Sequence, residues 1–298
     1  QTDAIVFSTV NTDGATTYSW INDNTSIGLA ESGDENNILS FAAIAGTSSE
    51  VATIEVTPIY TNNGILCTGD PETFTITVNP TPTMNTPSNI EVCNGAQDVV
   101  INFTTDNTGG VTTYAWSATG PEIGLPDSTT DITDSTADIT FNANNPDSAP
   151  RVVTIEVTPI FTNDGITCTT EDSQTFTITV NPEPQITNFT EIICEGDTFA
   201  DITPLDNTDG VVPAGTTYTW VIANTSSDAI EGASASTSAS ATIPGSQLTL
   251  VDGTTSPQDL IYTVTPTSAD DCVGETFTVT ITVNPTPTMN TPSNIEVC

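Results

Sequence analysis

Basic side chains are almost absent from this chain. It has no lysine and no histidine, a single arginine (Arg151) and 38 acidic residues, which give a formal net charge of −37. A surface this acidic repels nucleic acid and anionic membranes. Without His and Lys there is no histidine base, no Schiff-base lysine and no Ser-His-Asp triad. We therefore expect no enzyme, no nucleic-acid partner and no membrane insertion.

Long hydrophobic runs are also missing. No stretch approaches the roughly 20 apolar residues that cross a bilayer, and Gln1 does not begin a secretion signal. Helix formers are scarce, whereas Thr, Ser, Asn and Asp are abundant and suit strands and turns. We expect a soluble, all-β chain whose signal or anchor lies elsewhere.

A threefold internal repeat organises the sequence. A Tyr-x-Trp strand recurs at Trp20, Trp116 and Trp220. A strand containing VTP and then a closing strand, TFTITVNP or TFTVTITVNP, follow each tryptophan in the same order. Because apolar and polar residues alternate strictly over these stretches, each predicts a half-buried β-strand.

The middle copy illustrates the predicted fold. Its expected strands are 90–93, 99–104, 112–117, 137–142, 152–161 and 175–181, with a short extra strand near Ile123. About seven short strands in roughly 100 residues are typical of an immunoglobulin-like sandwich, where a Trp on the third strand packs in the core. We assign Trp20, Trp116 and Trp220 to that role; stacking on a sugar is the alternative.

Proline-rich connectors separate the repeats. Pro-x-Pro favours an extended, semi-rigid linker, so the sandwiches should lie end to end in a rod on the order of 120 Å long. The residues 286–298 repeat 81–93 letter for letter, so we expect a window on a longer array. The predicted divisions are a repeat lacking its first strand at 1–80, a linker at 81–88, a repeat at 89–182, a linker at 183–188, a repeat at 189–285, and a linker with the first strand of a next repeat at 286–298.

Six cysteines alternate between the loop before a closing strand and the opening strand of a unit: Cys67, Cys93, Cys168, Cys194, Cys272 and Cys298. Neighbours 26 residues apart straddle a linker and would lie about one domain apart. If the opening strand and the last hairpin share one end of a sandwich, bridges form within repeats. The predicted bridges are Cys93–Cys168 and Cys194–Cys272, with Cys67 and Cys298 paired outside this chain. Disulfides favour an oxidising compartment, and zinc is a poor alternative without CxxC or His.

Acidic loops precede the Tyr-x-Trp strands. They contain Asp13, Asp106, and the pair Asp206 and Asp209. Calcium takes six to eight oxygen ligands, so two or three from one loop do not suffice. We interpret the loops as Asx-type turns, with weak calcium binding as the alternative. No other cofactor is expected.

The sequences VCNG at 92–95 and ICEG at 193–196, with the Tyr-x-Trp, VTP and TFTITVNP strands, resemble the PKD-like immunoglobulin-fold repeats of large surface proteins of Bacteroidota-type bacteria. The resemblance covers essentially the whole chain. It implies export by the type IX route and a place in adhesins, gliding-type filaments or spacers within surface enzymes. The segments 127–129, 134–136 and 147–149 look like the Asp-Ser/Thr-apolar O-glycosylation pattern of that bacterial group, with chance occurrence in a Ser/Thr-rich chain as the alternative.

These features together predict an extracellular structural segment on a bacterial cell surface, forming the stalk or shaft of an adhesin or filament. The alternatives are a spacer within a large secreted surface hydrolase and a weak glycan-binding module. The expected partners are further copies of the same repeat and a host or environmental surface reached through a distal tip.

Overall fold

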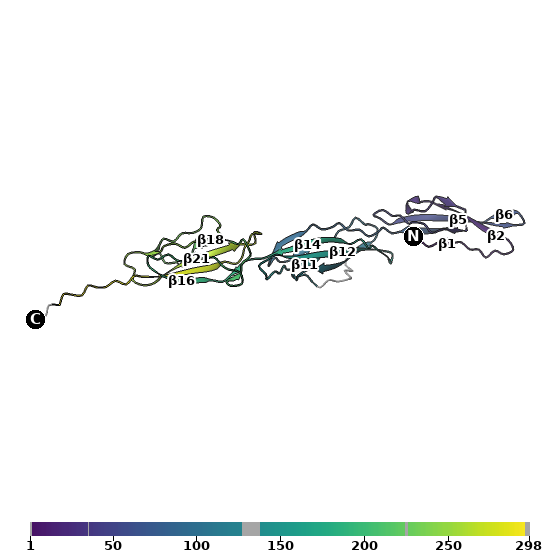
Figure 1. Cartoon of the computed structure of the whole chain (residues 1–298). Coiled ribbons are helices and arrows are strands. Elements are labelled where there is room, and N and C mark those ends of the chain that lie inside the picture. Colours follow the sequence, from purple (N-terminus) through teal and green to yellow (C-terminus); the bar gives the residue numbers. More distant parts are fainter. Residues whose placement is uncertain (1, 35, 127–137, 224–225, 296–298) are drawn as a thin grey trace.

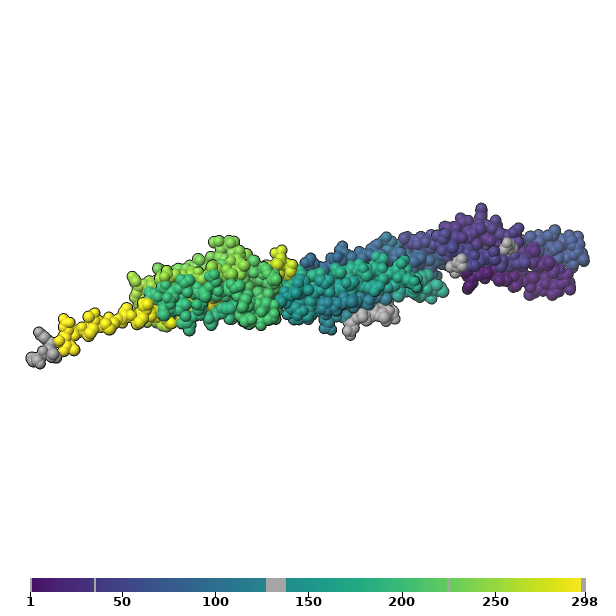
Figure 2. All heavy atoms as spheres, viewed as in Figure 1, coloured from purple at the N-terminus to yellow at the C-terminus, as the bar shows by residue number. Residues whose placement is uncertain are grey.

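The computed structural model describes residues 2–34, 36–126, 138–223 and 226–295. Its strands form β-sandwich repeats that follow one another in line, from the N-terminal repeat to the C-terminal one (Figure 1). The space-filling view shows a narrow rod with a thin C-terminal tail (Figure 2). The predicted all-β sandwich fold is confirmed. Cys298 and the glycosylation patterns at 127–129 and 134–136 lie outside the described residues. Within the described residues, no helix is both long and apolar enough to span a membrane.

The first repeat is built around its longest strand, β5. This strand pairs with β2 along one edge and with β6 and β7 along the other. Its buried residues alternate, with Ala52, Ile54 and Val56 facing the core. The elements are β1 (Ile5–Val6), β2 (Ala15–Asn22), the 3-10 helix η1 (Thr25–Ile27), β3 (Ser32–Gly33), β4 (Asn37–Ile38), β5 (Glu50–Asn62), β6 (Ile65–Thr68) and β7 (Glu72–Val78).

The second repeat has a sheet in the order β10-β12-β14-β8, with β13 also paired to β12, and a second layer of β11 and β9. The opening strand β8 runs parallel to the closing strand β14. The elements are β8 (Ile90–Cys93), β9 (Val99–Ile101), β10 (Val111–Thr119), β11 (Ile139–Phe141), β12 (Arg151–Asn163), β13 (Ile166–Thr169) and β14 (Gln174–Asn181).

Most strands predicted for this repeat are confirmed, with two corrections. The strand expected near Ile123 is wrong: the residue is 1% exposed but lies in a loop, where its carbonyl oxygen accepts a hydrogen bond from Asn144 N. Ile123 is therefore buried although it does not belong to a strand. The second correction is β13, which was predicted to be the loop before the closing strand and which extends β12 into a long hairpin.

The third repeat repeats this plan with a sheet in the order β16-β22-β21-β18, and β16 again runs parallel to the closing strand β22. Its elements are β15 (Gln185–Ile186), β16 (Phe189–Cys194), β17 (Gly210–Val211), β18 (Thr217–Ile222), β19 (Ile230–Glu231), β20 (Thr249–Leu250), β21 (Gln258–Thr267) and β22 (Phe277–Asn284).

Each repeat has its own hydrophobic core, and a tryptophan lies in each. Trp20, Trp116 and Trp220 are 6%, 6% and 8% exposed, and the tyrosine two residues before each is buried as well. Residues two apart on a strand face the same side, so the Tyr-x-Trp pattern places both rings inward. These tryptophans are packed, which leaves little of their surface for stacking on a sugar.

The first repeat differs from the others at one sheet edge. Among the described residues, no strand pairs with the outer edge of β7, where β8 and β16 lie in the other repeats. Without a strand at this edge, the side chains of β7 are more exposed. Phe74 and Ile76 of β7 are only half-buried, whereas their counterparts Phe176 and Ile178 are 3% and 0% exposed.

Candidate functional site at the junctions between repeats

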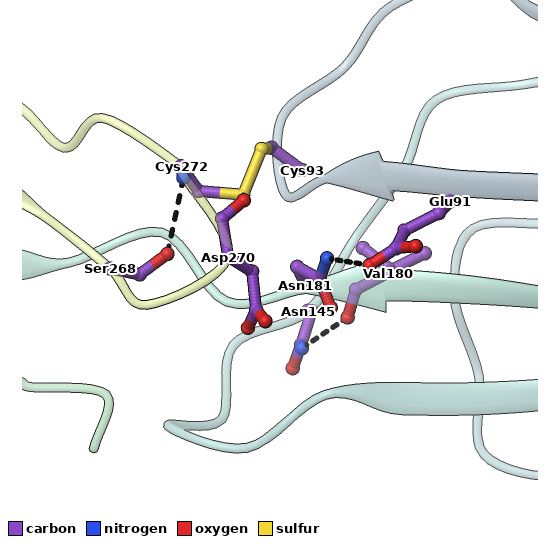
Figure 3. Close-up of a disulfide and its surroundings, with 8 residues drawn as sticks. All are labelled: Glu91, Cys93, Asn145, Val180, Asn181, Ser268, Asp270 and Cys272. Atoms are coloured by element: carbon purple, nitrogen blue, oxygen red, sulfur yellow. Dashed lines mark hydrogen bonds between the residues drawn. A yellow bond between two sulfur atoms is a disulfide. The ribbon is translucent and has the colours of Figure 1, made fainter. Parts of the chain in front are cut away.

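A disulfide joins two repeats. Cys93, at the end of β8 in the second repeat, is bonded to Cys272, in the loop before the last strand of the third, with a Cα–Cα distance of 5.6 Å (Figure 3). Cys67, Cys168 and Cys194 are unbonded within the part of the chain that the structure describes. The predicted bridges within repeats, Cys93–Cys168 and Cys194–Cys272, are therefore wrong.

Strand direction explains the error. In the parallel pair of β8 and β14, Cys93 lies beside Asn181, at the end of the closing strand. Cys168 is on β13, next to the start of that strand, so β14 separates the two cysteines by about 23 Å at 3.3 Å per residue. The opening cysteine and the hairpin cysteine thus lie at opposite ends of one sandwich. Each of these two ends faces a neighbouring repeat.

The linker between the second and third repeats is packed rather than free. Pro182 and Pro184 are buried. Gly274, two residues after the disulfide-bonded Cys272, lies so close to the linker that a Cβ atom there would clash with the Pro184 carbonyl oxygen. The hairpin of the third repeat therefore rests directly on the linker.

Polar contacts continue across the same junction. Ser148 Oγ of the second repeat donates a 2.6 Å hydrogen bond to Asp206 Oδ2 of the third. Beneath the disulfide, Asn145 is 2% exposed and its Nδ2 donates to the carbonyl oxygen of Val180 at 2.8 Å (Figure 3). The Asn145–Val180 hydrogen bond lies within the second repeat, whereas the disulfide and the Ser148–Asp206 hydrogen bond cross the junction and hold the third repeat against the end of the second.

The junction between the first and second repeats relies on amide side chains. Asn163, at the tip of the β12–β13 hairpin, donates from Nδ2 to Asn79 Oδ1 at 3.0 Å and to Ser49 Oγ at 3.1 Å. Ser49 Oγ in turn donates to Asn79 Oδ1 at 2.8 Å. Both described junctions therefore share one plan, in which the hairpin of a repeat reaches back to the end of the repeat before it.

In the second and third repeats, the loop that precedes the Tyr-x-Trp strand holds the incoming linker. In the second repeat, Asn107 is 8% exposed, and its Oδ1 accepts from Thr83 N at 2.7 Å while its Nδ2 donates to the Thr81 carbonyl oxygen at 3.2 Å. In the third, β15 of the linker pairs with β17. These loops were predicted as candidate sites for their acidic residues, and Asn107 was not identified. Its position two residues after Thr105 indicated only the local turn that the two residues form.

The acidic residues of these loops have partners of their own. Asp206 Oδ1 accepts from Val212 N at 2.9 Å, and these hydrogen bonds, led by that from Ser148, lower the pKa of the Asp206 carboxyl. Asp209 Oδ2 accepts from Leu205 N at 2.8 Å, as expected of a turn. Aligned on the NTDG motifs at 11–14 and 207–210 and on NTGG at 107–110, Asp13 matches Asp209 and Asp106 matches Asp206, so no acidic residue is shared by all three repeats. Among the described residues, no three His, Cys, Asp or Glu side chains form a metal-binding group, and calcium at these loops stays a prediction.

The carboxyl of Glu183, in the linker between the second and third repeats, lies where its charged form is disfavoured. Burial in the linker, together with the negative charge of Glu275, raises the pKa of Glu183 above its ordinary value. A carboxyl whose pKa is higher in the folded state binds its proton more tightly there. It therefore contributes stability at low pH that is lost as pH rises through the folded-state pKa.

Glu183→Gln is accordingly expected to raise the melting temperature at pH 7, by an amount equivalent to no more than about 1 kcal/mol because the group is partly screened by water. The gain should shrink as the pH falls through the raised pKa of Glu183, because the native carboxyl also becomes neutral there. Thermal melts from pH 4 to 8 would measure it. The matched control is Glu171→Gln, which removes the same charge from an exposed loop. An equal gain in both variants would show that net charge, not the junction, is responsible.

One known family matches the third repeat. Residues 191–287 match the family model described as a PKD-like domain. The third repeat is thus similar to PKD-like domains. The other two repeats share its Tyr-x-Trp strand and its closing TFTITVNP-type strand. PKD-like and immunoglobulin-like domains are typically non-catalytic.

Several solved structures are similar to this chain at low sequence identity. The I-band fragment I67–I69 from titin is 8% identical, with a TM-score of 0.41, and the match covers 91% of this chain and 88% of that chain. Human CDH23 EC21–23 is 13% identical, with a TM-score of 0.41 and coverage of 90% and 88%. Drosophila N-cadherin EC1–4 is 10% identical, with a TM-score of 0.36 and coverage of 93% and 68%. No curated protein matches the sequence.

Proposed function

We propose that this chain is a non-catalytic, extracellular segment that forms the stalk or shaft of a bacterial cell-surface adhesin or filament. The observation that carries the proposal is the pair of packed junctions. A flexible tether between independent domains needs exposed, mobile linkers. Here Pro182 and Pro184 are buried, and a disulfide connects one repeat to the next.

The disulfide also supports a location outside the cell. Disulfides persist in oxidising compartments such as the cell exterior. The net charge of −37 gives long-range repulsion between like segments and keeps a long, exposed surface hydrated. Both properties support a place outside the cell. The bacterial surface, and a distal tip that contacts a host or environmental surface, are further parts of the proposal.

Small-angle X-ray scattering of the whole chain tests the mechanical part of this proposal. A straight rod about 120 Å long has a radius of gyration near 35 Å, whereas a compact globule of this length would have about 19 Å. We expect the larger value, unchanged between about 0.15 and 1 M salt, where screening removes charge repulsion. A radius that collapses at high salt would show that repulsion, not packed junctions, extends the chain, and would contradict the shaft function.

A further inference from the structure

A turn at the end of the second repeat, the docking turn (145–151), faces a loop of the third repeat, the acidic loop (205–212). At the point of contact, Ser148 Oγ donates to Asp206 Oδ2 at 2.6 Å, a distance typical of a charge-assisted hydrogen bond. Asp206 also accepts from Asn207 Nδ2 at 2.8 Å and, through Oδ1, from Val212 N at 2.9 Å. The acidic loop therefore orients this carboxylate with its own groups, and Ser148 is the partner from the preceding repeat.

The docking turn is held from inside by Asn145, which is 2% exposed. Its Oδ1 accepts from Asp147 N at 3.0 Å, and its Nδ2 donates to the carbonyl oxygens of Ala149 at 2.9 Å and Val180 at 2.8 Å. Figure 3 shows this side chain next to the end of β14, at the same junction as the disulfide. These hydrogen bonds fix the backbone on both sides of Ser148.

The docking turn is held from outside by Arg151, the single basic residue of the sequence. Its Nε donates to Asp147 Oδ2 at 2.8 Å, and its Nη1 donates to the Glu122 carbonyl oxygen at 2.7 Å. The fork of the guanidinium can make both bonds at once. Arg151 thus ties the docking turn to the loop after β10. It also neutralises Asp147, the carboxylate next to Ser148, at the place where a second carboxylate, that of Asp206, approaches.

The junction between the first and second repeats makes the equivalent contact through backbone groups. Thr108 N, in the loop that matches the acidic loop, donates to the Thr47 carbonyl oxygen at 2.8 Å, and Ser48 forms a parallel bridge with Thr108. Asp106, the counterpart of Asp206, accepts from Asn85 Nδ2 of the linker at 3.3 Å. The same two regions therefore meet at both junctions, with different chemistry.

The residue at the position of Arg151 differs in the same way. The matched sequences VATIEVTPI at 51–59 and VVTIEVTPI at 152–160 make Glu50 the counterpart of Arg151. Glu50 Oε2 accepts from Asn24 Nδ2 and Ser26 Oγ at 3.5 Å each, within its own repeat. The arginine thus occurs where the next repeat presents an aspartate side chain, and the glutamate occurs where the next repeat presents a backbone amide.

We propose that Arg151 is a positioning residue of the junction between the second and third repeats. It holds the docking turn so that Ser148 engages Asp206, and it makes the end of the second repeat specific for a repeat whose acidic loop presents an aspartate side chain. The proposal rests on the shaft function and deepens it, because it names residues that select which repeat follows which.

The Cys93–Cys272 disulfide reports closure of this junction, because it forms across the same interface. The test equilibrates the reduced whole chain in glutathione buffers of fixed potential and measures the ratio of bonded to reduced Cys93–Cys272 pairs by peptide mapping. Ser148→Ala removes the hydrogen-bond donor and should lower this ratio about threefold to tenfold. Arg151→Gln should lower it by a similar factor. An unchanged ratio in either variant would overturn the proposal.

Arg151→Glu tests specificity, because it introduces the residue that the first repeat has at this position. It should lower the ratio further than Arg151→Gln, since a negative charge then lies beside Asp147. The control is Thr154→Glu, an exposed position on the same strand, which changes the net charge by the same amount as Arg151→Gln and should alter the ratio by less than about twofold. Equal losses from this control and from Arg151→Gln would show that net charge is responsible, and would contradict a positioning role.

Combining the variants distinguishes positioning from general destabilisation. If Arg151 acts through Ser148, Arg151→Gln should have little further effect on the disulfide ratio in a chain that already carries Ser148→Ala. Additive losses would contradict the proposal.

The Asp206 carboxyl provides an independent measurement. The hydrogen bond from Ser148 is the main cause of its lowered pKa. Ser148→Ala and Arg151→Gln should therefore each raise the pKa of Asp206 toward its ordinary value, with no further rise in the double variant, as followed by NMR of chain labelled with ¹³C-aspartate. An unchanged Asp206 pKa in Arg151→Gln would overturn the role of Arg151. Such a failure leaves the scattering result, and with it the shaft function, unaffected.

Discussion

Replacing both Cys93 and Cys272 with serine is expected to lower the free energy of unfolding of the second and third repeats by about 2 to 5 kcal/mol. The disulfide closes a loop over a sequence separation of 179 residues, so it restricts the unfolded chain strongly. The chain-entropy estimate for a loop of this length is about 5 kcal/mol. Denaturant titration followed by tryptophan fluorescence would measure the loss.

Cys194→Ser is the matched control for this experiment. Cys194 is exposed and unbonded in the described chain, so its replacement should change the free energy of unfolding by no more than about 0.5 kcal/mol. The double variant should also broaden the range of interrepeat angles seen by scattering. An unchanged denaturation midpoint in the double variant would contradict the bridge between repeats.

Trp116→Ala is expected to destabilise the second repeat by about 3 to 5 kcal/mol. The indole is 6% exposed and is surrounded by the core of that repeat, so its removal leaves a cavity that the neighbouring strands cannot close. The first and third repeats have separate cores and should keep their stability. Hydrogen exchange read by mass spectrometry would localise the loss to β10, β12 and β14.

Val111→Ala, on the same strand as Trp116, is the control for that prediction. Val111 is 48% exposed, so its truncation should cost no more than about 0.5 kcal/mol. If Trp116→Ala also accelerated exchange throughout the first and third repeats, the repeats would be folding as a single unit, contrary to the three cores described above.

Much of the fold could be predicted because alternation is a local property. The strands containing Val153, Ile155 and Val157, and the closing strand containing Phe176 and Ile178, show their buried face directly in the spacing of apolar residues. The loop at Ile123 could not be predicted in this way. A single buried residue in a loop has no period, so its burial depends on distant strands.

The candidate site was less predictable, because it is formed between repeats. Asn107 was not identified, since an asparagine that binds a linker and one that closes a turn have the same local sequence. The same limit applied to Glu183, whose raised pKa depends on burial in the linker and then on the charge of Glu275 in the next repeat. Contacts of this kind depend on how one repeat is placed against another.

By itself, the sequence determined the repeat, its approximate length, the all-β class and the tryptophans at the core. The alternation of apolar and polar residues, the proline-rich linkers and the internal repeats can all be read from the order of the residues alone. Only the tertiary structure decided the disulfide pairing. Cysteine spacing allowed bridges within or between repeats, and the choice depended on whether the opening strand runs parallel or antiparallel to the closing strand. The parallel pairing of β8 with β14 carries Cys93 to the far end of its sandwich, where Cys272 of the next repeat is the cysteine within reach.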